Sequence, residues 1–178
     1  AVYDVHHALR YPRFHQDYSR SQIKRITAKY HLPTNYFLFL GTRQPRKNLD
    51  RLIEAVNRLP NTNLVIVGKT WSQFSTTSYQ LRATNHIVEL GYVPDSDLPL
   101  LMLGSQALVL PSLYEGFGIP VAEAMAVGTP VVVSKVSSLP EIVGDAGILI
   151  DPYDVNNLVN GLKQILDLTP SNRVKLVR

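Results

Sequence analysis

The chain has 178 residues, of which 45 % are hydrophobic and 18 % are charged, a balance that indicates a globular domain. This length is enough for one domain with a substantial core and is short for two ordinary domains. The absence of cysteine excludes disulfide bonds, thiolate metal sites and a cysteine nucleophile.

The formal net charge of +4 suggests at first an acidic partner such as nucleic acid. Residues 1–30, however, carry six lysines and arginines against two aspartates, and the rest of the chain carries twelve residues of each sign. The main body therefore has no overall basic character, and we expect no nucleic-acid partner. Since no apolar run reaches the roughly 18 residues that span a bilayer, and residues 1–14 lack the apolar core of a signal peptide, we expect a cytoplasmic protein.

The expected elements begin with an amphipathic helix over residues 19–30. We interpret residues 1–34 as a lead-in to one domain over residues 35–178, within which short apolar runs alternate with segments of helical periodicity. The predicted strands cover residues 36–41, 63–68, 86–90, 106–111, 130–134 and 147–151. Their nearly continuous Val, Ile and Leu content is typical of parallel strands that are buried on both faces.

Polar residues precede the helical segments that follow these strands. Asn48, Asp95 and Asp154 are predicted N-cap residues, and one more helix is expected to start near residue 171. The repeated strand–helix pattern predicts an α/β, doubly wound, Rossmann-like domain of three layers, with a mostly parallel sheet of about six strands. Ligands bind such sheets at the carboxyl ends of the strands, so the candidate loops cover residues 41–48, 68–75, 91–95, 111–118 and 134–138.

The first of these loops reads GTRQPRKN and places Arg46 and Lys47 just before a helix. Two cations beside a helix N-terminus favour binding of phosphate oxygens. A solvated basic loop is the alternative.

The second loop contains Gly68-Lys69-Thr70, which resembles the end of a P-loop. That motif needs a glycine five residues before Gly68, where this chain has Asn63 inside a strand, so we reject a P-loop. Lys69 then either faces an anion or lies on the surface.

The segment from residue 110 to 134 is the richest in polar signals. Gly116 and Gly118 allow backbone N–H groups to approach a ligand closely, and Pro120 fits a first helical turn. Glu123 lies in the apolar stretch VAEAMAV, where a carboxylate is costly unless it is paired or accepts hydrogen bonds from ligand hydroxyls. A dinucleotide-binding fingerprint is disfavoured because Val121 stands where the third glycine belongs.

The pair His6-His7, with Asp4, is better interpreted as part of a solvated loop than as a metal site, because adjacent histidines point in different directions. No serine, histidine and aspartate have a spacing that indicates a catalytic triad.

Four segments together resemble one family: GTRQPRKN, VIVGK, LGYVPDSDLPLLM and PSLYEGFGIPVAEAMAVGTPVVVSKVSSLPEIVGDAGILIDPYD. They are similar to the C-terminal, donor-binding domain of retaining glycosyltransferases of family 4 (group 1 glycosyltransferases), which have the GT-B fold. The resemblance covers about residues 35–168, and its central signature is a pair of glutamates eight positions apart, Glu115 and Glu123.

The resemblance implies a role for each matching residue, and it makes Arg46, Lys47 and Glu115 the catalytic ones. Arg46 and Lys47 would bind the donor diphosphate and stabilise the charge of the leaving group. Glu115 would face the donor sugar, and Glu123 would accept hydrogen bonds from the ribose. The other implied donor-binding residues are Thr42, Arg43, Gly68, Lys69, Val93, Gly116, Phe117 and Gly118, with Val93 in the loop that meets the nucleobase. Relatives often have arginine at position 42, so the share of Arg43 in phosphate binding stays open.

The resemblance also implies a donor substrate, a UDP-sugar or a GDP-sugar, with no cofactor and no metal. The implied activity is hexose transfer with retention, in polysaccharide or glycan biosynthesis. Because this family has an acceptor-binding N-terminal domain, we interpret the chain as an excised donor-binding domain that lacks it and is not catalytically complete alone; membrane contact is expected only through the intact enzyme. The alternative is a noncatalytic nucleotide-sugar-binding module with a separate acceptor subunit, and an isomerase of the same fold is less favoured.

Overall fold

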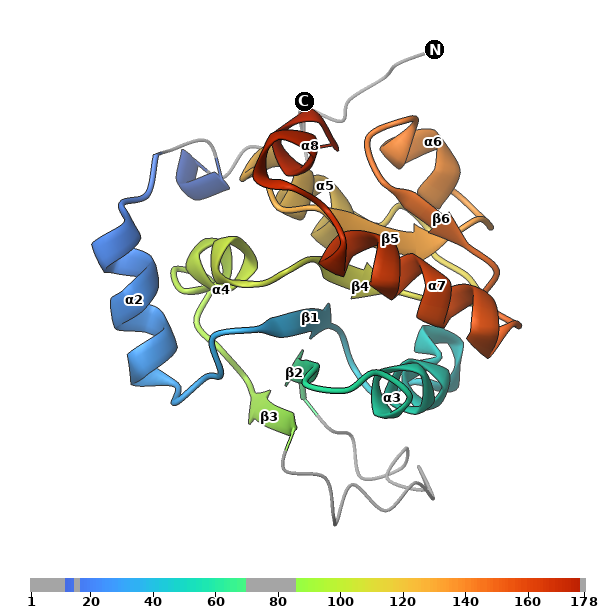
Figure 1. Cartoon of the computed structure of the whole chain (residues 1–178), viewed down its shortest axis with the longest axis horizontal. Coiled ribbons are helices and arrows are strands. Elements are labelled where there is room, and N and C mark those ends of the chain that lie inside the picture. The colour runs from blue at the N-terminus through green and yellow to red at the C-terminus, as the bar shows by residue number, and fades with distance from the viewer. Residues whose placement is uncertain (1–11, 15–16, 70–85, 177–178) are drawn as a thin grey trace.

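The computed structural model describes residues 12–14, 17–69 and 86–176. Within these ranges, six parallel strands form one sheet in the order β3-β2-β1-β4-β5-β6 (Figure 1). The strands are β1 Tyr36–Leu40, β2 Asn63–Val67, β3 Ile87–Gly91, β4 Leu108–Leu110, β5 Val131–Ser134 and β6 Ile148–Ile150. The sheet confirms the predicted fold class, and every strand lies within two residues of its expected position.

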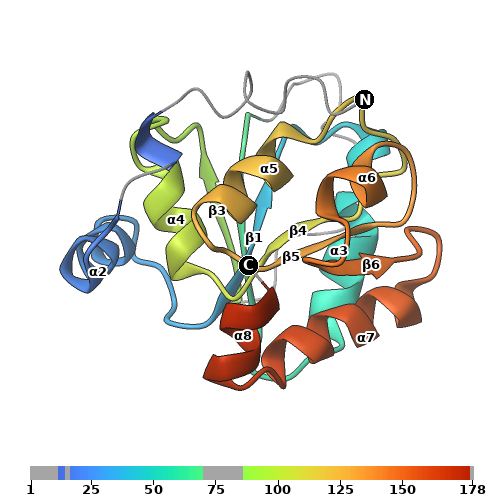
Figure 2. The same ribbon diagram turned by 90° about the horizontal axis from the view of Figure 1, so that it is seen from above.

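Helices cover both faces of this sheet. They are η1 Pro12–Phe14, α2 Arg20–Lys29, η2 Pro45–Lys47, α3 Leu49–Asn57, α4 Leu98–Gly104, α5 Ile119–Ala126, α6 Leu139–Val143, α7 Val155–Leu166 and α8 Pro170–Leu176. Helices α3 and α7 pack together on one side, whereas α4, α5 and α6 form a row on the other, with α2 outside α4 (Figure 2). The result is the predicted three-layer arrangement.

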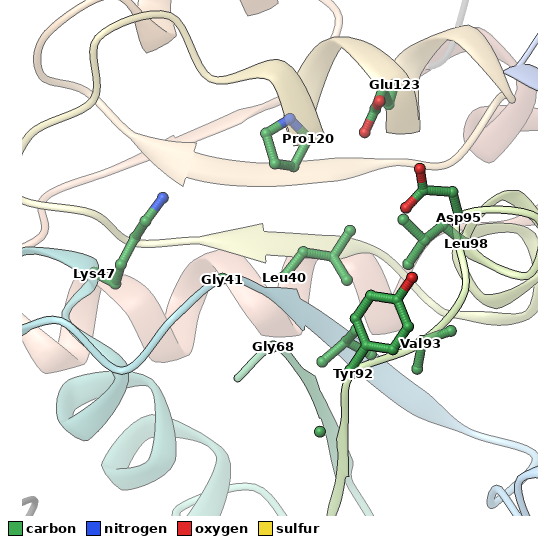
Figure 3. A pocket seen from close by; sticks show the side chains of 12 residues that line it. Leu40, Gly41, Lys47, Gly68, Tyr92, Val93, Asp95, Leu98, Pro120 and Glu123 are labelled. Carbon is green, nitrogen blue, oxygen red and sulfur yellow. The ribbon is translucent and has the colours of Figure 1, made fainter. Parts of the chain in front are cut away.

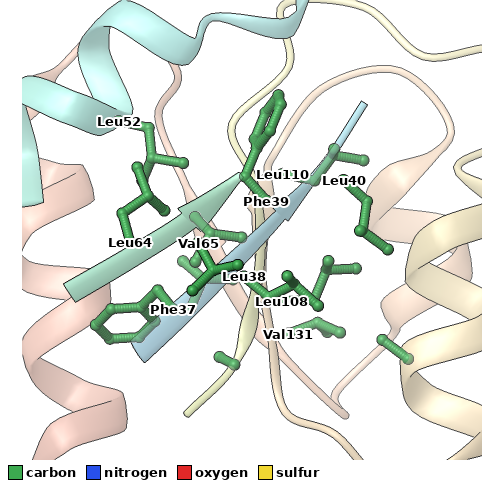
Figure 4. Packing of buried hydrophobic residues seen from close by; sticks show 14 of the residues in the cluster. Phe37, Leu38, Phe39, Leu40, Leu52, Leu64, Val65, Leu108, Leu110 and Val131 are labelled. Carbon is green, nitrogen blue, oxygen red and sulfur yellow. The ribbon is translucent and has the colours of Figure 1, made fainter. Parts of the chain in front are cut away.

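The core lies between the sheet and these helices (Figure 4). All five residues of β1 are buried, and Leu38 and Leu108, which are paired across β1 and β4, have no exposed surface. Replacing such a leucine with alanine costs about 2–5 kcal/mol, because the cavity left behind adds to the lost burial. The central strands are therefore a rigid base for the loops at their carboxyl ends.

The expectation that every strand is buried on both faces is wrong for β3 and β6. The residues of β3 are mostly half-exposed and include Glu89, and Leu149 of β6 is 41 % exposed. The reason is position, because β3 and β6 are the edge strands and each has a neighbour on one side only.

Two of the three predicted N-caps also need correction. Asp154 does cap α7, since its side chain accepts a hydrogen bond from the Asn156 N–H at 2.8 Å. Asn48 precedes α3 but does not cap it; its side-chain amide donates to the carbonyl oxygens of Pro111 and Pro152 at 2.9 and 2.7 Å. Helix α4 begins later than expected, so that Asp97, not Asp95, stands at its N-cap position.

The strand order reverses between β1 and β4. From β1 the chain adds β2 and β3 on one side, and from β4 it adds β5 and β6 on the other. The loops that leave β1 and β4 therefore diverge, and in sheets of this kind the resulting crevice binds ligands.

Candidate functional site

A pocket of about 280 Å³ opens at the carboxyl ends of β1, β2 and β3, beneath α5 (Figure 3). Its lining comes from the ends of β1, β2 and β3, the loops that follow them, the start of α4 and the first turns of α5. The lining residues are Leu40, Gly41, Lys47, Val67, Gly68, Gly91, Tyr92, Val93, Asp95, Leu98, Pro120 and Glu123. Four residues predicted for donor binding or catalysis, Lys47, Gly68, Val93 and Glu123, thus meet around one space. They come from four loops or helices that are far apart in the sequence.

Lys47 and Glu115 form a buried ion pair beside this pocket. The ammonium of Lys47 lies 2.6 Å from Oε1 of Glu115, and the two side chains are 10 % and 8 % exposed. Ser112 donates its hydroxyl to the same oxygen at 2.6 Å, and Arg46 lies 3.3 Å from the other carboxylate oxygen. Burial alone would raise the pKa of Glu115, but the hydrogen bonds from Lys47 and Ser112 and the nearby positive charges outweigh it and lower that pKa.

The backbone joins the same two loops. The N–H of Leu113 donates to the carbonyl oxygen of Arg46 at 2.7 Å, and a guanidinium nitrogen of Arg46 donates to the carbonyl oxygen of Tyr114 at 3.2 Å. The N–H of Glu115 also donates to the Ser137 hydroxyl at 3.3 Å. The three residues predicted as catalytic, Arg46, Lys47 and Glu115, are therefore fixed together, and of these three only Lys47 lines the pocket.

Glu123 points from α5 toward the pocket (Figure 3). Burial raises the pKa of its carboxyl group to about 7; the nearby charge of Arg13 lowers it, and that of Asp95 raises it. A carboxyl group in this state accepts hydrogen bonds from ligand hydroxyls once the ligand displaces water. The expectation that this residue faces a ligand agrees with its place in the pocket wall.

Two glycines have conformations that the site requires. Gly68 has a φ of +143°, and a Cβ there would lie 2.0 Å from the carbonyl oxygen of Gly41, so no larger residue fits between the loops after β1 and β2. Gly118, before α5, has a φ of +81°, and a Cβ there would lie 2.7 Å from Leu139. Gly116, by contrast, is exposed, and a Cβ there would meet open space. Of the three glycines predicted to bind the donor, only Gly68 and Gly118 are therefore required by the backbone conformation and packing.

The remaining predicted donor-binding residues lie near the pocket but are not part of its lining. Arg43 forms an ion pair with Glu89 on the edge strand β3. The ammonium of Lys69 lies 5.6 Å from the centre of the Tyr92 ring. Thr42 is half-buried, and Phe117 is exposed at the start of α5.

Tyr92, Asp95 and Leu98 line the pocket, but the sequence led us to assign none of them a binding role, although residues 91–95 were a candidate ligand loop. The signal was available, because the segment GYVPDSDL follows a predicted strand and contains all of them. His6 and His7 lie outside the described residues, as does Thr70. Among residues 12–14, 17–69 and 86–176, no group of three or more His, Asp and Glu side chains is placed to hold a metal ion. None of the helices in these ranges combines the length and the apolar character that crossing a bilayer requires.

The strand order and the pocket at the carboxyl ends of the strands define a doubly wound α/β domain with a candidate ligand site. Residues 21–177 match the family described as glycosyl transferases group 1, and the chain belongs to this family. The fold is that of one half of a GT-B glycosyltransferase, as the resemblance implies.

Three known proteins illustrate the relationship. The O-antigen chain mannosyltransferase B of Escherichia coli is 43 % identical over 150 residues, which are 79 % of this chain and 39 % of that protein. The structure of sucrose-phosphate synthase from Thermosynechococcus elongatus has a TM-score of 0.75 at 28 % identity, covering 87 % of this chain and 42 % of that one. HepE of Anabaena, solved with UDP-glucose, has a TM-score of 0.78 over 90 % of this chain and 46 % of that one, and at 23 % identity the likeness concerns the fold alone. The chain thus spans less than half the length of each of these three proteins.

Proposed function

We propose that this chain is the donor-binding part of a glycosyltransferase that takes a hexose from a nucleoside diphosphate sugar. The observation that carries the proposal is the pocket itself, in which Lys47 and Glu123 face one space from opposite walls. A cation suits the diphosphate, and a carboxyl group suits the hydroxyls of the ribose. The acceptor-binding domain expected from the resemblance would complete the enzyme.

We propose mannose as the first sugar to test, because the relative with 43 % identity is named as an O-antigen chain mannosyltransferase. A role in building a polysaccharide follows from the same name. The binding experiment below distinguishes a uracil donor from a guanine donor.

In the proposed reaction, the bond between the sugar C1 and the diphosphate oxygen breaks, and the acceptor oxygen bonds to C1 on the same face. Because the new bond forms on the face that the leaving group vacates, the configuration at C1 is retained. The acceptor proton passes to the departing diphosphate. Arg46 and Lys47 would stabilise the negative charge that develops on that diphosphate. Glu115 forms ion pairs with both cations. We propose that the phosphates of the donor attract these cations, and that Glu115 then accepts hydrogen bonds from hydroxyls of the donor sugar.

The proposal also holds that binding needs no divalent cation, because Arg46 and Lys47 supply positive charge beside the pocket. The experiment is calorimetric titration of the chain with UDP, GDP, UDP-glucose and GDP-mannose, each with EDTA and then with magnesium. We expect saturable binding of one base series, with the same affinity in both conditions. Failure of all four ligands to bind at millimolar concentration would overturn the proposed function, and binding only with magnesium would overturn the metal-free part.

A further inference from the structure

The β3–α4 loop, residues 92–97, is held from outside the pocket by the lead-in segment. Asp95 of this loop forms an ion pair with Arg13 of η1 at 3.3 Å. Asp97 accepts hydrogen bonds from the Lys29 ammonium and the Tyr30 hydroxyl, each at 2.6 Å. Tyr92, Val93 and Asp95 of the same loop line the pocket.

Asp97 is at the N-cap position of α4, but its side chain makes no capping hydrogen bond. An aspartate there usually accepts from the backbone N–H groups of the first helical turn and stabilises the helix. Here the carboxylate, 13 % exposed, binds Lys29 and Tyr30 instead. The usual local hydrogen bond is thus replaced by contacts with a segment 67 and 68 residues earlier in the chain.

The lead-in is itself anchored, so it can act as a fixed support. Ile26 of α2 and Phe14 of η1 are buried in the core. Helix α2 lies along α4 (Figure 2), and Gly104 leaves room at their contact, because a Cβ there would lie 2.8 Å from the Tyr36 hydroxyl and 3.4 Å from both Ile23 and Thr27. The ends of Lys29 and Tyr30 are therefore held at one place relative to the sheet.

Besides Asp97, the loop is held by Val93, which is buried in the core, and by the ion pair between Arg13 and Asp95. Gly91, which precedes it, accepts a hydrogen bond from the Gly68 N–H at 2.8 Å, and the Asp97 N–H donates to the Pro94 carbonyl oxygen at 2.9 Å. Since the second of these bonds is internal to the turn, it does not set the position of the turn against the pocket. The hydrogen bonds to Asp97 do so, and O–H···O⁻ and N⁺–H···O⁻ bonds of this length are among the stronger ones in proteins.

From this geometry we infer that Lys29 and Tyr30 are positioning residues for the nucleotide: through Asp97 they fix the β3–α4 loop, and with it Val93 and Asp95, where the nucleobase of the donor would lie. The inference rests on the proposed function. It assigns residues of the lead-in, which do not line the pocket, a part in donor affinity. A purely structural contact between α2 and α4 would stabilise the fold without changing affinity.

The test uses two variants and a matched control. Tyr30→Phe removes one hydroxyl that binds Asp97, and Asp97→Asn removes the charge. Tyr36→Phe is the control, because it also removes a tyrosine hydroxyl that binds α4, the 2.8 Å hydrogen bond to the Leu101 carbonyl oxygen, but away from the loop. Titration with UDP and GDP and amide hydrogen exchange of residues 92–97 are measured on all four proteins.

We expect Tyr30→Phe and Asp97→Asn each to weaken binding of the preferred nucleotide about five- to tenfold and to speed exchange in residues 92–97 while residues 41–48 are unchanged. Tyr36→Phe should lower the unfolding temperature and leave the dissociation constant within about twofold of the wild type. A fifth protein, the double variant Tyr30→Phe/Asp97→Asn, should bind only slightly more weakly than Asp97→Asn alone, because both changes break the same contact.

Nucleotide affinity within about twofold of the wild type in Tyr30→Phe would overturn the inference, as would an equal loss in the Tyr36→Phe control. If Asp97→Asn does not fold, Tyr30→Phe alone decides. A wild-type chain that binds neither nucleotide would overturn the proposed function and this inference with it, whereas binding by the wild type and unchanged binding by the variants would overturn the inference alone.

Discussion

Lys47 and Glu115 lie on loops that follow different strands, yet the Lys47 ammonium and the Glu115 carboxylate meet at 2.6 Å with both side chains almost entirely buried. A buried ion pair gains little over a well-packed apolar pair, but removing one partner leaves an uncompensated charge in the interior. A change at Lys47, which is proposed to bind the diphosphate, should therefore also change the stability of the chain.

The first prediction follows from this pair. Lys47→Met should lower the free energy of unfolding by about 2–3 kcal/mol, because Glu115 keeps only Arg46 and Ser112 as partners. Adding Glu115→Gln to this variant should recover part of the loss, since the unpaired charge is then gone. Urea unfolding of the single and double variants measures the difference. A Lys47→Met variant as stable as the wild type would show that water reaches this carboxylate.

The second prediction compares the two arginines of the β1–α3 loop, Arg43 and Arg46. Arg46→Ala should weaken nucleotide binding about five- to tenfold while changing stability little, because the Arg46 side chain is 43 % exposed. Arg43→Ala should change affinity by less than about twofold, because Arg43 is paired with Glu89 on the edge strand. Calorimetric titration with the preferred nucleotide measures both. If Arg43→Ala costs as much as Arg46→Ala, Arg43 leaves Glu89 to bind the phosphates.

The third prediction concerns pH. Burial raises the pKa of Glu123 to about 7, so the folded chain holds this proton more tightly than the unfolded chain does. The contribution of this group to stability is complete below its ordinary pKa, near 4.5, and is lost as the pH rises through about 7. Glu123→Gln stays neutral, so it should be more stable than the wild type at about pH 8 and lose that advantage toward pH 4.5.

Urea unfolding across this pH range tests the third prediction, with Glu141→Gln, at an exposed position on α6, as the control. The control should follow the wild type at every pH. A gap between Glu123→Gln and the wild type that does not change with pH would contradict the assigned cause.

The fourth prediction compares two glycines of one loop. Gly118→Ala should destabilise the chain by about 1–3 kcal/mol, because alanine is strained at a φ of +81° and its Cβ would crowd Leu139. Gly116→Ala should stay within about 0.5 kcal/mol of the wild type, because its Cβ would meet open space. Thermal unfolding of the two variants gives the comparison, and equal losses would refute it.

The strands were predictable because runs such as YFLFL and LVIV are apolar throughout, and a central parallel strand buries such a run. The exposure of β3 was not predictable. Whether a strand lies at the edge or in the centre of a sheet depends on the order of the strands, which a local sequence pattern does not encode. Glu89 in the middle of that strand was the one local hint.

Glu123 was predictable as a pocket residue because burying a carboxylate in an apolar helix is costly unless the carboxylate faces a partner or a ligand. The contact between Lys47 and Glu115 was not, since 68 residues separate them and nothing local in either loop specifies the other. Asn48 and Asp97 were misjudged for a related reason. Each stands before a helix, where a cap is the usual role, but each side chain binds a distant segment instead.

Asn48 joins three parts of the chain through one side-chain nitrogen, which reaches carbonyl oxygens 63 and 104 residues further on. Contacts across such long stretches form late, because the entropy of closing large loops must be overcome first. We therefore expect the pocket lined by Lys47, the neighbour of Asn48, to reach its final form late, once the segment around Pro152 has docked. During refolding, the rate at which a labelled nucleotide gains fluorescence would therefore report when the binding site forms.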